Sequence, residues 1–90
     1  MLTQDKYKLI WVKWVDSQGG TNRWEDINDL EPEPHYIISV GYLIHDKNEH
    51  RVIAAHISFN DESDKTLYAC QGYMTIPYCQ TIEVKELSIT

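Results

Sequence analysis

The chain has few of the residues that mark a disulfide scaffold, a zinc site or a membrane span. Its two cysteines, Cys70 and Cys79, match neither a CxxC redox pair nor a zinc knuckle, and we expect both to be reduced. A disulfide between them is the alternative if the chain turns back at residues 74–77. No apolar run reaches the ~20 residues of a membrane span, and Lys13 interrupts the first one, unlike in a signal peptide. We therefore expect a cytoplasmic protein.

Positive charge is also scarce. The chain has 8 Lys and Arg against 14 Asp and Glu, which gives a net charge of −6, and the basic residues are scattered. A protein that neutralises phosphates needs clustered Lys and Arg, so the composition argues against general nucleic-acid binding. Acidic residues instead gather between Glu25 and Glu33. This segment is either the solvated face of a helix or a surface that imitates the charge of nucleic acid.

Recognisable catalytic motifs are missing as well. No serine or cysteine lies in a GxSxG-like setting, and no carboxylate pair has an acid–base spacing, so we predict a non-enzymatic protein without catalytic residues. The four histidines lack metal-ligand spacing, which predicts no metal and no cofactor: His35, His45, His50 and His56. His56 interrupts an apolar strand. It is either a hydrogen-bonded core histidine or a contact to a ligand or an interface.

Apolar runs separated by polar breaks dominate what is present. Residues 37–44 and 52–59 flank the polar stretch 46–50, which is the pattern of a β-hairpin. Further strands are predicted at residues 7–15, 66–76 and 81–87, the last one half-buried. In a chain of this length the five strands have room for one core, so we expect a single domain over residues 1–90.

One short helix is predicted between the first two strands. Trp24, Ile27 and Leu30 recur at helical spacing, Thr21 or Asn22 can cap the start, and prolines follow at 32 and 34. Gly72 indicates a bend or bulge in the fourth strand, and a one-turn break follows Pro77. This ending resembles an SH3-like barrel. The predicted fold class is mainly β with one short helix, as a small SH3-like five-stranded barrel or a strongly bent antiparallel sheet.

Both faces of the first strand are apolar. Trp11 shares one face with Leu9 and Val15, while Trp14 lies on the other. Either this strand lies under a helix, or its second face meets another subunit. We expect Trp11 and Trp24 in the core and Trp14 at a partner, most simply a second copy in a homo-oligomer.

The loop at residues 17–23 has the only phosphate-like pattern. Glycine amides and Arg23 are able to hold an anion there, but an ordinary flexible loop has the same composition. If the chain binds a nucleotide, we expect the rings of Trp14, Trp24 or Tyr73 to stack on its base. The candidate ligand-binding set is Trp14, Gly19, Gly20, Arg23, Trp24, His56 and Tyr73.

Several segments resemble short accessory proteins of bacteriophages and prophages: residues 14–17, Trp24, and residues 39–44, 55–57 and 74–77. The similarity spans about residues 9–84, and this chain differs by a longer polar turn at 60–65. It implies a counter-defence protein in the host cytoplasm that sequesters a small nucleotide signal or blocks a host defence protein. The alternative is a structural homo-oligomer without a small-molecule ligand.

Overall fold

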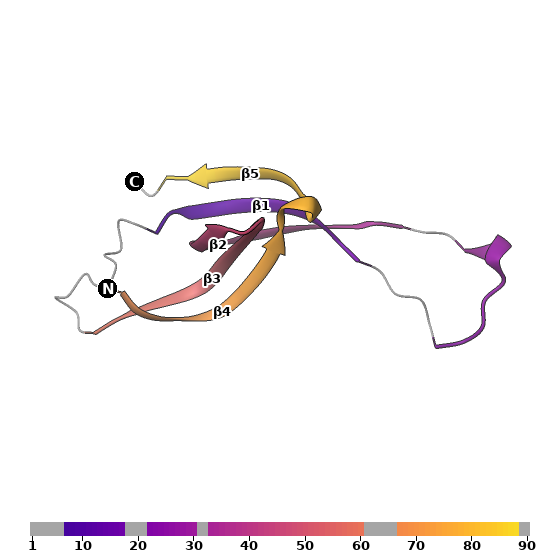
Figure 1. The fold of residues 1–90 in the computed structure, drawn as a ribbon, viewed down its shortest axis with the longest axis horizontal. Coiled ribbons are helices and arrows are strands. Elements are labelled where there is room, and N and C mark those ends of the chain that lie inside the picture. The colour runs from indigo at the N-terminus through magenta and orange to yellow at the C-terminus, as the bar shows by residue number, and fades with distance from the viewer. Residues whose placement is uncertain (1–6, 18–21, 31–32, 61–66, 89–90) are drawn as a thin grey trace.

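The computed structural model describes residues 7–17, 22–30, 33–60 and 67–88. Its strands are β1 (Leu9–Asp16), β2 (His35–Lys47), β3 (His50–Phe59), β4 (Leu67–Pro77) and β5 (Thr81–Leu87). Among these residues two short 3-10 helices accompany the strands, η2 (Ile27–Asp29) and η3 (Tyr78–Gln80). All strand pairs are antiparallel and form one sheet in the order β4-β3-β2-β1-β5 (Figure 1). The prediction of a mainly β protein with five strands is confirmed.

The predicted central hairpin is present as β2 and β3. Their connection is the pair Asn48 and Glu49, with φ angles of 55° and 62°. Two consecutive positive φ angles define the tight type of hairpin turn whose twist matches the flanking strands. Asn adopts this conformation readily, whereas Glu does so at a steric cost. The hairpin register therefore depends on a turn with one favourable and one unfavourable residue.

The core lies on one face of the sheet. It consists of Ile10, Val12, Trp14, Ile53 and Ile76, with Ile37 and Leu43 packed against it. Alternation along β1 places its even-numbered residues inward, so Trp14 is buried and Trp11 faces the opposite way. The prediction that Trp11 fills the core while Trp14 faces a partner is therefore wrong. The strand register determines which of the two faces is buried. Because both faces of β1 are apolar, the sequence pattern does not reveal that register.

The sheet is strongly bent. Gly41 is buried, and a Cβ added there would lie 2.9 Å from the carbonyl oxygen of Ala54, so only glycine lets β2 and β3 approach this closely. Gly72 has a φ of 66° inside β4, which curves along its length (Figure 1). The predicted bend at Gly72 thus agrees with the backbone. In the strand order β4 and β5 are the two edges, so the sheet is open and not a closed barrel.

Two predictions about local structure are wrong. The helix expected around Trp24 and Leu30 is only the single 3-10 turn η2, which Asp26 caps by accepting from the backbone N–H of Asn28 at 2.9 Å. The apolar spacing there is helical, but Trp24, Ile27 and Leu30 all remain exposed, and short helices need a surface on which to bury their apolar side. The last strand is also not half-buried, since Ile82 and Val84 on its inner side remain exposed at the open edge.

The one-turn break before the last strand is confirmed as η3. Gln80 donates from its side-chain amide to the backbone oxygen of Val15 at 3.2 Å, and Thr81 donates its hydroxyl to the carbonyl of Pro77 at 3.1 Å. The Gln80 bond holds the β4–β5 connection against β1, and the Thr81 bond closes the connection itself. As a result β5 leaves η3 in position to pair with the far side of β1.

Candidate interaction surface

The side of the sheet opposite the core carries exposed or half-buried apolar residues on β1 and β2, with charged residues of β5 beside them. We call it the outer face. Cross-strand pairing places its members side by side, in rows such as Val40, Trp11 and Lys85 or Ile38, Lys13 and Glu83. The outer face consists of Trp11, Lys13, Val15, Tyr36, Ile38, Val40, Glu83 and Lys85.

The centre of the outer face is a row of three residues on β2. Tyr36, Ile38 and Val40 are 60%, 56% and 51% exposed. Every second residue of a strand projects to the same side of the sheet. These three side chains therefore form one continuous apolar strip. Sequence reasoning missed this strip because it read residues 37–44 as a single apolar run. The signal that identifies it is the alternation with Ile37 and Ser39, which point inward.

Two lysines lie over the aromatic rings of the outer face. The Lys85 ammonium is 4.7 Å from the centroid of the Trp11 ring, and the Lys13 ammonium is 5.8 Å from that of Tyr36. Lys85 also has an ion pair with Glu83 at 3.7 Å. Their aliphatic stems shield part of the rings while the charges stay in water. The outer face is thus an apolar strip with a basic border.

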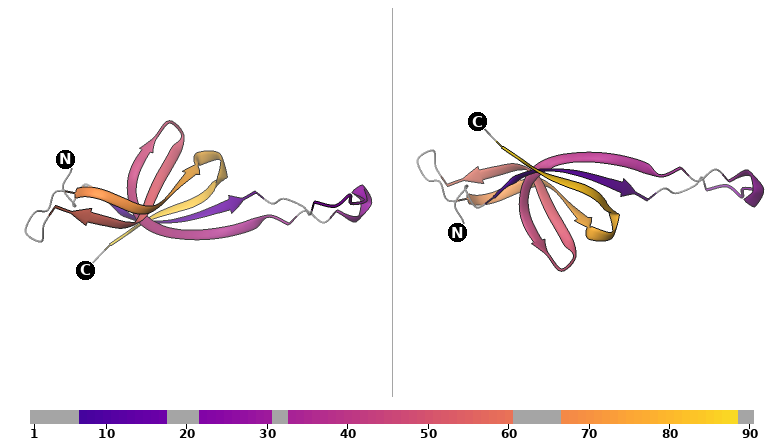
Figure 2. Two further views of the ribbon diagram at one scale, coloured as in Figure 1. Left: turned by 90° about the horizontal axis from the view of Figure 1, so that it is seen from below. Right: turned by 90° about the horizontal axis from the view of Figure 1, so that it is seen from above.

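A second exposed apolar cluster lies at residues 22–30, which we call the tip segment. Two views of the molecule place it beyond the ends of β1 and β2, away from the rest of the sheet (Figure 2). Trp24 is fully exposed, and Ile27 and Leu30 are 83% and 51% exposed. Asp26 and Asp29 accompany them. The expectation that Trp24 lies in the core is therefore wrong, because the segment forms only one 3-10 turn and leaves the ring exposed.

A third cluster, which is polar, connects the β2–β3 turn to η3. We call it the hairpin clasp. Asp46 and Arg51 are cross-strand partners in the hairpin, and the Tyr78 hydroxyl donates a hydrogen bond to Asp46 Oδ1. The Arg51 guanidinium is 4.2 Å from the Tyr78 ring centroid and its Nε is 3.8 Å from Asp46 Oδ1. The Tyr78 backbone N–H donates to the carbonyl of Glu49 at 2.8 Å.

The clasp changes the acidity of one of its members. The hydrogen bond to the Asp46 carboxylate, followed by partial desolvation and the negative charge of Asp46, raises the pKa of Tyr78 above its ordinary value of 10.0. Arg51 acts in the opposite direction. Because a neutral phenol donates to a carboxylate and a phenolate is repelled by it, the clasp holds Tyr78 protonated. We assign it a structural role, since it joins two connections of the sheet.

The candidate ligand-binding residues lie in separate parts of the fold. Trp14 is in the core, where its indole Nε1 donates to Ser39 Oγ at 3.1 Å. Arg23 and Trp24 belong to the tip segment, and Gly19 and Gly20 lie outside the described residues. His56 and Tyr73 lie on the neighbouring strands β3 and β4, close in the register, and both are exposed.

The position of His56 differs from the one that we expected. The interpretation as a core histidine is wrong, because His56 pairs with Gln71 in the exposed distal part of the β3–β4 pair. The core residue Ile53 lies three positions earlier in β3, nearer to β2. An apolar sequence context therefore does not place this histidine in the core, since the His56 side chain itself is exposed.

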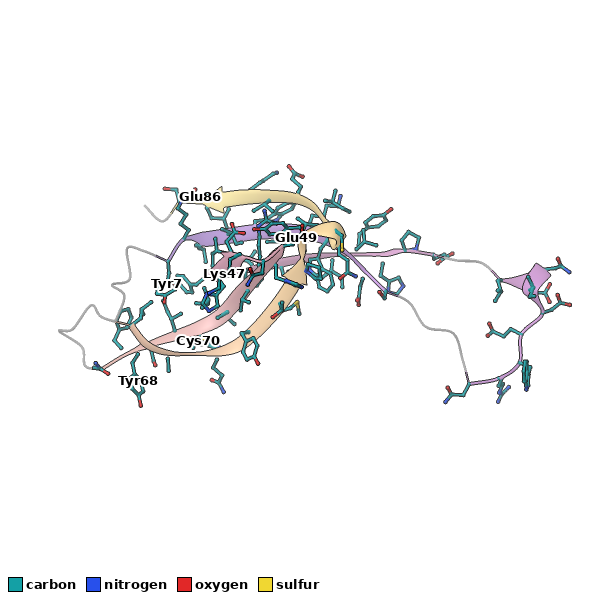
Figure 3. The ribbon with its side chains drawn as sticks, viewed as in Figure 1. Tyr7, Lys47, Glu49, Tyr68, Cys70 and Glu86 are labelled. Carbon is teal, nitrogen blue, oxygen red and sulfur yellow. The ribbon has the colours of Figure 1, made fainter. Side chains whose placement is uncertain are left out.

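Neither metal binding nor disulfide bonding is supported in the part of the chain that the structure describes. That part contains no group of three or more His, Cys, Asp or Glu placed to hold a metal ion. Cys70 and Cys79 are both free and exposed, as expected for reduced thiols. Cys70 lies near Tyr68 on β4, at the opposite side of the molecule from Glu86 on β5 (Figure 3).

Comparisons with protein-family models, with curated proteins and with solved structures found no match to this chain. The fold and its exposed surfaces therefore carry the functional argument. Among the described residues no helix has the length and apolar character needed to cross a membrane.

Proposed function

We propose that this chain is a non-enzymatic binding protein whose outer face is covered by another protein. The observation that carries the proposal is the exposed strip of Tyr36, Ile38 and Val40 on the side of the sheet that does not form the core. Scattered apolar residues are normal on protein surfaces, whereas contiguous strips mark interaction sites. Trp11 and Tyr36 add the aromatic side chains that most often dominate binding energy.

A protein partner fits this surface better than a small molecule does. A sheet face offers broad contact to another protein, while small ligands need a concave site that encloses most of their surface. Nucleotide sequestration within one subunit has less support, because Trp14 packs in the core and Trp24 lies in the tip segment. We therefore favour direct contact with a protein over capture of a nucleotide signal.

The biological setting that we propose is that of a phage accessory protein in the host cytoplasm that blocks a host defence protein. The resemblance to such proteins and the binder-like surface support it. We also propose that the sheet is an open variant of an SH3-like barrel. Its support is the order β5-β1-β2-β3-β4 together with the one-turn helix η3 before the last strand.

The test is capture from a bacterial host extract on the immobilised full-length protein, followed by purification of the captured protein and calorimetric titration. We expect saturable binding that Ile38→Asp weakens roughly tenfold or more, a loss of at least ~1.4 kcal/mol. A charge in the middle of the apolar strip must be desolvated on binding, which explains the loss. Tyr68→Ser is the matched control, since it removes an exposed aromatic residue at the β4 edge.

Equal binding by wild type and Ile38→Asp, or the absence of any saturable protein partner, contradicts the proposal. Native mass spectra of protein purified from host cells provide the second measurement. A nucleotide-sized mass that is retained in the native state and released on unfolding would replace the protein-contact proposal by nucleotide sequestration.

A further inference from the structure

The tip segment and the outer face are chemically complementary. We infer that the tip segment of one copy docks on the outer face of a second copy, and that two copies exchange their tips reciprocally. The inference rests on the proposed function, because it concerns the same face: the tip of a second copy covers the outer face in the free protein, and a host protein that binds there displaces it. The resulting dimer has a two-fold axis, which is the commonest symmetry of soluble oligomers.

The tip segment needs an apolar partner. Trp24, Ile27 and Leu30 surround a single 3-10 turn, and a segment of this length has no core of its own in which to bury them. Tryptophan alone offers roughly 200 Å² to a partner. Three large apolar side chains that are exposed together in so short a segment are expected to lie against another surface in the working protein.

The charges of the two surfaces are opposite. The tip segment carries Glu25, Asp26 and Asp29 against Arg23, a net charge of −2, while the outer face carries Lys13 and Lys85 against Glu83, a net charge of +1. Glu83 is the acidic member of that face, and it is already paired with Lys85. The apolar side chains of the tip segment can therefore pack on the apolar strip of the outer face, while its acidic residues lie near the basic residues of that face.

The shape of the molecule favours a second copy over the chain's own face. The principal extents are 60 × 26 × 24 Å, and the tip segment lies at one end of the long axis, beyond β1 and β2 (Figure 2). Reciprocal exchange lets every copy contribute both a tip and a face. Two such contacts together approach the scale of about 800 Å² per partner that stable interfaces bury.

Sedimentation equilibrium of the full-length protein tests this inference with variants of each surface. We expect wild type to dimerise, and Trp24→Ser and Ile38→Asp each to raise the dissociation constant roughly tenfold or more. Tyr68→Ser, the control at the β4 edge, is expected to dimerise like wild type. Circular dichroism melts check that the variants stay folded, since Trp24, Ile38 and Tyr68 all lie outside the core.

Mixing the two impaired variants is the sharper test. Trp24→Ser retains an intact face and Ile38→Asp retains an intact tip, so a mixed dimer has one complete tip-on-face contact. We expect the mixture to associate more strongly than either variant alone, because in the other contact the second substitution removes little from an interaction that the first has already broken. Added salt is expected to weaken the wild-type dimer, because it screens the opposite charges.

Three results would overturn the inference. They are a wild type that stays monomeric at about 100 µM, a Trp24→Ser variant that dimerises like wild type, and a mixture that associates no more strongly than its components. If the protein is monomeric and its outer face still binds a captured host protein, then tip exchange is wrong and the proposed function stands. If dimers form and no host protein binds, the partner of the outer face is the second copy alone.

Discussion

Trp14 on β1 donates its indole N–H to the hydroxyl of Ser39 on β2 at 3.1 Å. The direct cross-strand partner of Trp14 is Ile37, so the bond runs diagonally to a residue two positions further along β2 on the same inner face. It satisfies the only hydrogen-bonding group of a buried indole. The bond therefore allows a tryptophan to occupy the core and fixes which face of β1 points inward.

Removing the acceptor of this bond is expected to destabilise the fold. Ser39→Ala leaves the buried indole N–H without its partner, which costs about 1 to 2 kcal/mol in the free energy of unfolding. Urea unfolding followed by circular dichroism measures it. A double-mutant cycle with Trp14→Phe is expected to give a coupling of about 1 kcal/mol. Coupling close to zero would mean that the bond does not contribute to stability.

Trimming the core is expected to cost more than the same change on the open edge. Ile76 is almost fully buried, so Ile76→Val should lower the unfolding free energy by about 1 kcal/mol through lost contacts and a small cavity. Ile82→Val is the matched control at a half-exposed position of the edge strand β5, where a change within about 0.5 kcal/mol is expected. Equal losses in both variants would show that β5 is covered in solution.

Much of the sheet was predictable because its signals are local. The polar break at 46–50 between two apolar runs identified the central hairpin, and the alternating pattern over residues 81–87 gave β5 with its observed bounds. The η3 break followed from Pro77, which cannot continue the ladder. These features depend on residues adjacent in the chain, so the sequence alone is sufficient for them.

The candidate site was less predictable because it depends on register and on distant pairs. The faces of Trp11 and Trp14 exchange on a one-residue shift, and no local pattern of β1 decides between them. The hairpin clasp joins Asp46 to Tyr78, which are 32 positions apart, and neither residue has a neighbouring motif. Helical spacing at Trp24 and Ile27 predicted a helix, but a helix also needs a surface to pack against.

Replacing one turn residue is expected to stabilise the protein. Glu49 has a φ of 62°, a left-handed conformation that costs an L-residue about 1 kcal/mol and costs glycine almost nothing. Glu49→Gly should therefore raise the free energy of unfolding by up to about 1 kcal/mol. Lys47→Gly is the control, because Lys47 lies in regular β2 backbone, where glycine is destabilising. A loss of stability in Glu49→Gly would show that its side chain matters more than its strain.

Tyr78 is expected to make stability depend on pH in the alkaline range. The hydrogen bond to Asp46 raises its pKa in the folded state above 10.0, so the folded protein retains a proton that the unfolded chain releases. The contribution of this group is complete below pH 10.0 and is lost as pH rises through the folded pKa. Unfolding measured from about pH 8 to about pH 11 should therefore show a steeper loss of stability in wild type than in Tyr78→Phe, since phenylalanine has no proton to release.

Tyr68→Phe, which removes an exposed phenol from β4, should follow the wild-type curve. Parallel curves for wild type and Tyr78→Phe would mean that the clasp is open in solution.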